Sequence, residues 1–141
     1  MSIFDAISHA LAAVSTGGFS THDASIGYFN SVTIETVLIA GMLIGGASFA
    51  LHIRSVQNRK PSHHQDSEFR SFIATIIALT ATITLLLASN GYETLEALRT
   101  ATFNAVSLGT STGFGNATGA GSAGDFASWA PGPQMILLIL L

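Results

Sequence analysis

The sequence predicts an all-α membrane protein, and three observations lead to that prediction. Of its 141 residues, 48% are hydrophobic and 9% are charged, whereas an ordinary soluble domain has about 25% charged residues. Long apolar runs follow one another along the chain, and the basic residues gather between two of them. The mean hydropathy is +0.52. So little charge would leave a soluble fold with an apolar surface, so we expect the chain to lie in a lipid bilayer.

The same composition excludes other classes of protein. Intrinsic disorder requires low hydrophobicity and high charge, the opposite of what is found. With 5 Lys and Arg against 8 Asp and Glu, the net charge of -3 offers no basic surface, so no nucleic-acid partner is expected. The absence of cysteine from the sequence excludes disulfides, a thiolate nucleophile and Cys-ligated zinc.

Three apolar runs are candidate spanning helices. Val32–Ile53 has one charged residue, Glu35, near its start; as a helix its 22 residues extend about 33 Å, which matches a hydrocarbon core of about 30 Å. Phe72–Ala88 is uncharged and is the second candidate. The third, Trp129–Leu141, is too short to span as it stands. We therefore expect the chain to be a fragment of a longer membrane protein.

The basic residues predict the orientation of these helices. Four of the five Lys and Arg residues lie in the loop between the first two runs: Arg54, Arg59, Lys60 and Arg70. Such clustering places the loop, residues 54–70, in the cytoplasm. Met1–Ser31 and Ser89–Ser128 then face the outside. Three histidines lie in or beside this loop without the spacing of metal ligands, so we expect a solvated loop there: His52, His63 and His64.

Two local patterns refine the picture of the helices. Gly41 and Gly45 form a G-x-x-x-G pattern in the first run, which lets helix backbones approach closely in lipid. We expect it to serve tight packing inside one subunit. Ser67, between Asp66 and Glu68, is expected to cap the second spanning helix.

An internal repeat relates the two external segments, and its members are 95 positions apart. The matching pairs are Ala6 and Ala101, Ala10 and Ala105, Gly18 and Gly113, and Phe19 and Phe114. Each segment predicts a helix of about three turns that ends in a Ser/Thr-Gly-Phe loop. A helix of that length is too short to span, so both segments are predicted to be re-entrant.

The glycine loops predict a cation site. Irregular backbone at membrane depth is tolerated where it is buried in protein or lines a watery cavity. Glycine lets successive carbonyls turn toward one axis, where their oxygens can replace the hydration shell of a cation. The negative end of the short helix favours a cation at the same place. Neither loop has a carboxylate, which disfavours Ca²⁺ and Mg²⁺ and indicates a monovalent ion. Phe19 and Phe114 are expected to pack behind the filter.

Two other interpretations of these loops were weighed. A phosphate-binding loop requires G-x-x-x-x-G-K-[ST], which is absent from the sequence. Both loops could instead be plain extracellular turns. The duplication and the flanking apolar runs favour the cation site over plain turns.

The chain resembles the TrkH/TrkG family of bacterial potassium uptake proteins. Phe4–Ser25 resembles the second pore loop of that family, and Ile34–His52 resembles the spanning helix that follows it. Asp66–Arg70 resembles the entry to the next repeat and Ser107–Phe114 its filter. The resemblance implies a K⁺-channel-like fold of four membrane–pore-loop–membrane repeats. This partial chain would supply the pore helix, filter loop and outgoing spanning helix of one repeat (1–53) and a cytoplasmic basic loop (54–71). Residues 72–141 would supply the incoming spanning helix, pore helix, filter loop and start of the outgoing helix of the next repeat.

The resemblance also implies a function. It indicates potassium transport across the bacterial inner membrane, in a multi-pass protein without enzymatic activity. Potassium would be held at the selectivity filter, and the motif carries that role to eight positions: Thr16, Gly17, Gly18, Phe19, Ser111, Thr112, Gly113 and Phe114. Members of the family pair as dimers and associate with a TrkA-like cytoplasmic nucleotide-binding regulatory subunit, which the 54–70 loop could meet. Membrane lipid is the remaining expected partner.

Several alternatives stay open from the sequence. The same architecture could form a sodium-preferring or non-selective cation channel. It could also be a non-transporting membrane scaffold in which Gly18 and Gly113 merely turn the chain. Asp5, Asp23 and Glu35 could raise the cation concentration at the outer mouth, or could simply be solvated.

Overall fold

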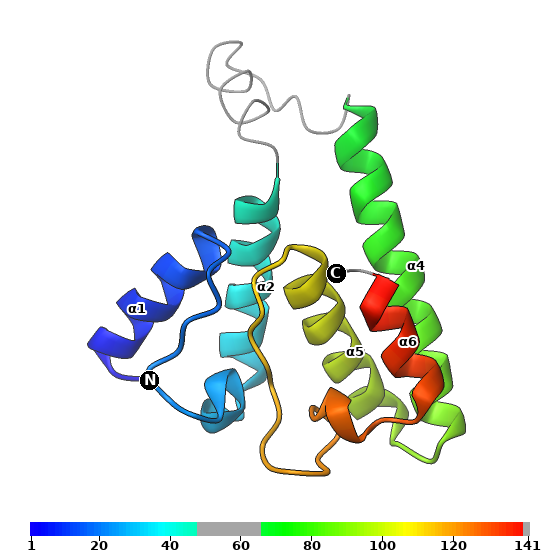
Figure 1. The fold of residues 1–141 in the computed structure, drawn as a ribbon. Helices are drawn as coiled ribbons and strands as arrows, with labels where there is room; N and C mark the ends of the chain where they lie inside the picture. The colour runs from blue at the N-terminus through cyan, green and yellow to red at the C-terminus, as the bar shows by residue number, and fades with distance from the viewer. Residues whose placement is uncertain (48–65, 140–141) are drawn as a thin grey trace.

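The computed structural model describes residues 1–47 and 66–139, and within these ranges every regular element is helical. In the described part of the chain, five α-helices and two short 3₁₀ helices follow one another (Figure 1). Their bounds are α1 Ile3–Val14, η1 Ser25–Phe29, α2 Val32–Gly46, α4 Ser67–Ser89, α5 Thr94–Gly109, η3 Phe126–Ser128 and α6 Pro131–Ile139. The predicted all-α fold is confirmed for the described residues.

We call residues 1–47 the first unit; it contains α1, η1 and α2. The helix α1 begins with a capping box, in which the Ser2 hydroxyl accepts from the Asp5 N–H and the Asp5 carboxylate accepts from the Ser2 N–H. The helix α2 ends at Gly46, where Ala47 turns to extended backbone. It is therefore shorter than the predicted 22-residue span, because two consecutive glycines are poor helix formers. The predicted continuation toward Ile53 and the three histidines lie outside the described residues.

We call residues 66–139 the second unit; it contains α4, α5, η3 and α6. Among the described residues, α4 is the one helix long and apolar enough to cross a bilayer. Its N-terminal cap is Asp66, whose carboxylate accepts from the Phe69 N–H at 3.0 Å, rather than the expected Ser67. The helix starts inside the stretch expected as a loop, because the Asp66 carboxylate can cap it there.

The two units pack against each other along α2 and α5, which lie side by side in the middle of the molecule (Figure 1). One buried cluster takes Leu38 and Met42 from α2 and Phe103 and Val106 from α5. A second cluster fills the space between α4, α5 and α6. The ends of α1 and α5 are thereby held near the same helix, α2.

The glycines of α2 allow this close packing. A Cβ added at Gly45 would overlap the Val14 carbonyl at the end of α1, and one at Gly46 would lie 2.8 Å from the Thr110 side chain at the end of α5. At Gly41 a Cβ would meet Ala13 at 3.4 Å, an ordinary contact. The G-x-x-x-G pattern thus serves contacts inside this chain, as expected.

Candidate ion-binding loops

The helix α1 ends in a loop whose first turn is fixed by two backbone hydrogen bonds. The Thr16 N–H donates to the Ala13 carbonyl at 3.3 Å, and the Gly17 N–H donates to the Ala12 carbonyl at 2.8 Å. This pair of bonds is the Schellman ending of a helix, which satisfies carbonyls that the helix itself leaves open. The chain therefore leaves α1 in a defined direction.

The helix α5 ends in the same way, 95 positions later. The Ser111 N–H donates to the Leu108 carbonyl at 2.9 Å, and the Thr112 N–H donates to the Ser107 carbonyl at 2.8 Å. Each donor and acceptor is the repeat counterpart of one in the first loop. The two loops therefore share their hydrogen bonding as well as their sequence motif.

The backbone angles repeat as well. Thr16 and Ser111 have φ of 51° and 56°, and Gly18 and Gly113 have φ of 64° and 88°. Positive φ costs a residue with a Cβ about 1–2 kcal/mol, whereas glycine adopts it freely. Two left-handed residues separated by one position give each loop a sharp double turn, which is not the conformation of an extended surface segment.

The two loops meet at Gly18. A Cβ added there would overlap the Thr112 carbonyl oxygen and would lie 3.2 Å from the carbonyl carbon of Gly113. Behind this contact, the Ile26 N–H of η1 donates to the Gly115 carbonyl at 3.0 Å. The first unit thus contacts the second loop both at its turn and on the segment that leaves it.

Some oxygens of the second loop are engaged inside the chain. The Ser107 hydroxyl on α5 donates to the Phe114 carbonyl at 2.8 Å, and both side chains of this pair are buried. The Thr112 hydroxyl lies 2.7 Å from that of Thr110, and the Thr112 residue is only 4% exposed. These hydrogen bonds hold the loop to its helix.

The two phenylalanines have different surroundings. Phe114 is 1% exposed and belongs to the cluster between the units, so it packs behind its loop as expected. Phe19 is 81% exposed within the described part of the chain, where its ring lies near Gly17. The expectation that both rings pack behind the filter therefore fits Phe114 but not Phe19.

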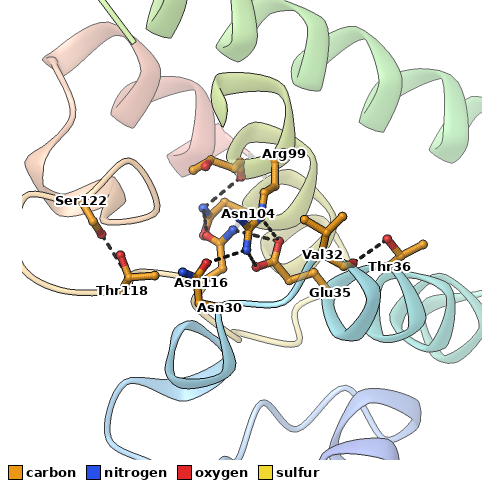
Figure 2. A network of polar contacts seen from close by, with 10 residues as sticks. Asn30, Val32, Glu35, Thr36, Arg99, Asn104, Asn116, Thr118 and Ser122 are labelled. Carbon is orange, nitrogen blue, oxygen red and sulfur yellow. Dashed lines mark hydrogen bonds and ion pairs between the residues drawn. The ribbon is translucent and has the colours of Figure 1, made fainter. Parts of the chain in front are cut away.

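An ion pair fixes the segment that follows the second loop. Arg99 donates to both carboxylate oxygens of Glu35, at 2.9 Å and 2.6 Å, and also to the Asn30 side-chain oxygen at 3.1 Å (Figure 2). The Asn116 amide donates to the same carboxylate at 3.5 Å. The Glu35 side chain is 3% exposed, so this carboxylate is a structural partner of Arg99 rather than a solvated acid at a mouth.

The other two acidic residues named from the sequence differ from Glu35. The hydroxyls of Ser2 and Thr21 each donate to the Asp5 carboxylate at 2.7 Å. These hydrogen bonds hold the pKa of Asp5 well below its ordinary value, so Asp5 stays ionised in mild acid. Asp23 is exposed. Within residues 1–47 and 66–139, no three metal-ligating side chains come together.

Comparison with known proteins identifies the family of this chain. The family model described as "TrkH: Cation transport protein" matches residues 1–140. The chain belongs to the TrkH family. The family assignment made from the sequence is thereby confirmed.

Individual relatives agree with this family assignment. The Trk system potassium uptake protein TrkH of Halomonas elongata is 44% identical over 144 aligned residues, covering 99% of this chain and 28% of that protein. The protein of the same name from Escherichia coli K12 is 43% identical over 117 aligned residues, covering 81% and 24%. The crystal structure of the potassium transporter TrkH from Vibrio parahaemolyticus matches with a TM-score of 0.85 and 34% identity, covering 99% of this chain and 30% of that one. This TrkH-family chain thus spans under a third of the length of these relatives.

Sequence reasoning missed the polar side chains that hold the TrkH-family loops in place. Glu35 and Arg99 are 64 positions apart, and their pairing depends on how α2 packs on α5. Two signals were nevertheless available. Arg99 is the one basic residue outside the 54–70 loop, and the 95-residue shift aligns the buried His9 with the buried Asn104.

Proposed function

We propose that this chain forms two quadrants of a potassium uptake pathway in the bacterial inner membrane. The observation that carries the proposal is the backbone contact of two loops with the same double turn, at Gly18 and Thr112–Gly113. Peptide oxygens gathered around one point are the ligands that replace water around a bare alkali ion. The relatives named as Trk system potassium uptake proteins support K⁺ as the transported ion.

The ion-binding positions proposed are the eight of the two motifs. They are Thr16, Gly17, Gly18, Phe19, Ser111, Thr112, Gly113 and Phe114. Main-chain carbonyls would coordinate the potassium ion, and the C-terminal ends of α1 and α5 would favour its charge. Because the Phe114 carbonyl and the Thr112 hydroxyl are already hydrogen-bonded inside the chain, we assign the main role in coordination to the other peptide oxygens.

The proposed arrangement in the membrane follows the repeat. Residues 1–53 and 72–141 would belong to two membrane–pore-loop–membrane repeats whose glycine loops face the outside, and residues 54–71 would form a cytoplasmic loop. The short pore helices are α1 and α5, while α4 is the incoming spanning helix of the second repeat. A second copy of the protein and a TrkA-like nucleotide-binding subunit are the proposed partners.

The proposal is tested by rubidium uptake into bacterial cells that lack other potassium systems and produce the intact protein. The unaltered protein should restore Rb⁺ uptake. K⁺ should inhibit that uptake at far lower concentrations than Na⁺ does. Gly18→Ser, which places a side chain against the Thr112 carbonyl, should abolish uptake at normal abundance in the membrane. Efficient competition by Na⁺ would instead indicate a sodium-preferring or non-selective channel. Normal uptake by Gly18→Ser would indicate that the glycines only turn the chain.

A further inference from the structure

One buried polar position occurs in both short helices. His9 in α1 and Asn104 in α5 are 95 positions apart, and both are 0% exposed. The His9 Nδ1 lies 2.7 Å from the Asp5 carbonyl, and the Asn104 amide donates to the Thr100 carbonyl at 3.1 Å. Asp5 and Thr100 are themselves repeat counterparts. Each side chain is therefore anchored to its own helix one turn earlier, in the same way.

Each of these side chains also reaches the segment that leaves its loop. Because the Asp5 carbonyl can only accept, Nδ1 of His9 is assigned as the donor to it, and Nε2 of His9 lies 2.8 Å from the Ser20 hydroxyl. The Asn104 amide donates to the Asn116 side-chain oxygen at 3.1 Å. We call these two contacts, His9–Ser20 and Asn104–Asn116, the connections. Each runs from the middle of a short helix to a residue just beyond the Gly-Phe pair of its loop.

The two connections end differently. The His9 ring packs edge-on against Phe29, with centroids 5.5 Å apart, and lies tilted against Phe114 of the other loop, with centroids 5.8 Å apart. The Asn104 connection continues through Asn116 to the Glu35 carboxylate and so to Arg99 (Figure 2). His9 therefore contacts both loops, whereas Asn104 fixes the second loop to the ion pair between the units.

We propose that His9 and Asn104 are equivalent positioning residues, which set the distance between each glycine loop and its short helix and thereby the preference of the pathway for K⁺ over the smaller Na⁺. The inference rests on the proposed transport function. Neither side chain needs to touch the ion, because a fixed loop holds the peptide oxygens apart at the spacing of a larger cation. A buried polar group that loses its partner lets the loop move or admits water.

The test uses the intact protein in cells that lack other potassium systems, and it measures the ratio of the K⁺ and Na⁺ inhibition constants for Rb⁺ uptake. His9→Leu and Asn104→Leu remove the connections without a large change in volume. We expect each to lower the K⁺ preference about tenfold, which corresponds to about 1.4 kcal/mol. His9→Gln, whose amide can still meet the Ser20 hydroxyl, should retain most of the preference. Thr102→Val, at a half-buried position of α5 whose hydroxyl donates to the Leu98 carbonyl of the same helix, is the matched control and should leave the ratio unchanged.

Double variants separate positioning from general damage to the fold. If Asn104 acts through Asn116, then the double variant Asn104→Leu with Asn116→Leu should shift the ratio by less than the product of the two single factors, since both changes remove the same Asn104–Asn116 hydrogen bond. Reduced abundance with an unaltered ratio in all Leu variants overturns the inference and leaves potassium transport standing. If the unaltered protein gives no Rb⁺ uptake, the proposed transport function is wrong, and so is the inference about His9 and Asn104.

Discussion

The two loops have the same backbone and different neighbours. Their helix endings, hydrogen bonds and positive φ angles repeat at a spacing of 95 residues. The side-chain surroundings of the two loops do not repeat. Phe114 is buried, whereas Phe19 is 81% exposed. The Glu35–Arg99 pair has no counterpart, because the positions 95 residues away are Ala130 and Phe4. The loop conformation is thus encoded by a few local residues. The side chains that hold each loop depend on what packs against it.

The largest expected effect comes from comparing the glycines of the two loops. Gly18→Ala combines positive φ with an overlap on the Thr112 carbonyl, whereas Gly113→Ala meets no atom within 4 Å among the described residues. We expect Gly18→Ala to lower Rb⁺ uptake by more than about tenfold and Gly113→Ala to lower it less, since strain alone costs about 1–2 kcal/mol. Uptake rates per amount of membrane protein measure the difference. Equal losses would show that the loops are alike in their contacts as well.

The next effect concerns the ion pair that only the second loop uses. Arg99→Met leaves the Glu35 carboxylate, 3% exposed, without a counter-charge, and we expect a loss of about 3–5 kcal/mol in the free energy of unfolding. Glu35→Gln should lower the free energy of unfolding by less, because the Arg99 side chain is partly exposed and its guanidinium can be hydrated by solvent. The double change Glu35→Leu with Arg99→Met should recover part of the loss. Unfolding of the purified protein in detergent measures all three, and a double variant as unstable as Arg99→Met would contradict a pairwise role.

A smaller effect should separate two glycines of α2. Gly45→Ala pushes against the Val14 carbonyl, so we expect a loss of about 1–3 kcal/mol. Gly41→Ala makes an ordinary contact with Ala13 and should be neutral or gain up to about 1 kcal/mol from helix propensity. The same unfolding measurement compares the two variants. Gly41→Ala is the control for Gly45→Ala, because both glycines lie on α2. Equal losses would mean that the contact with α1 is not the reason for Gly45.

The smallest effect should be shared by both loops. Thr16 and Ser111 adopt positive φ, at 51° and 56°, although both carry a Cβ. Thr16→Gly and Ser111→Gly should each relieve about 1 kcal/mol of strain and raise the unfolding temperature by similar amounts. Thermal unfolding in detergent measures the shift. A gain at one position alone would show that the two backbones are less alike in solution than their angles indicate.

The parts of the fold that could be predicted are those that depend on local sequence. The long uncharged run predicted α4, and the repeat predicted two short helices ending in glycine loops. The helix α5, with 16 residues, is longer than the predicted three turns, and its Arg99 pairs with Glu35 of α2, a contact that the local sequence does not reveal. The sequence also did not reveal the contacts of His9 and Asn104. Their partners, Ser20 and Asn116, come into reach only through the way each loop folds back along its short helix.

The end of α2 has a mechanical consequence. Gly45 lies against the last carbonyl of α1 and Gly46 against Thr110 at the end of α5. A shift of this end of α2 therefore presses on both helix ends together, because both contacts are close. A tilt of α2 that moves its C-terminal end therefore reaches both glycine loops at once.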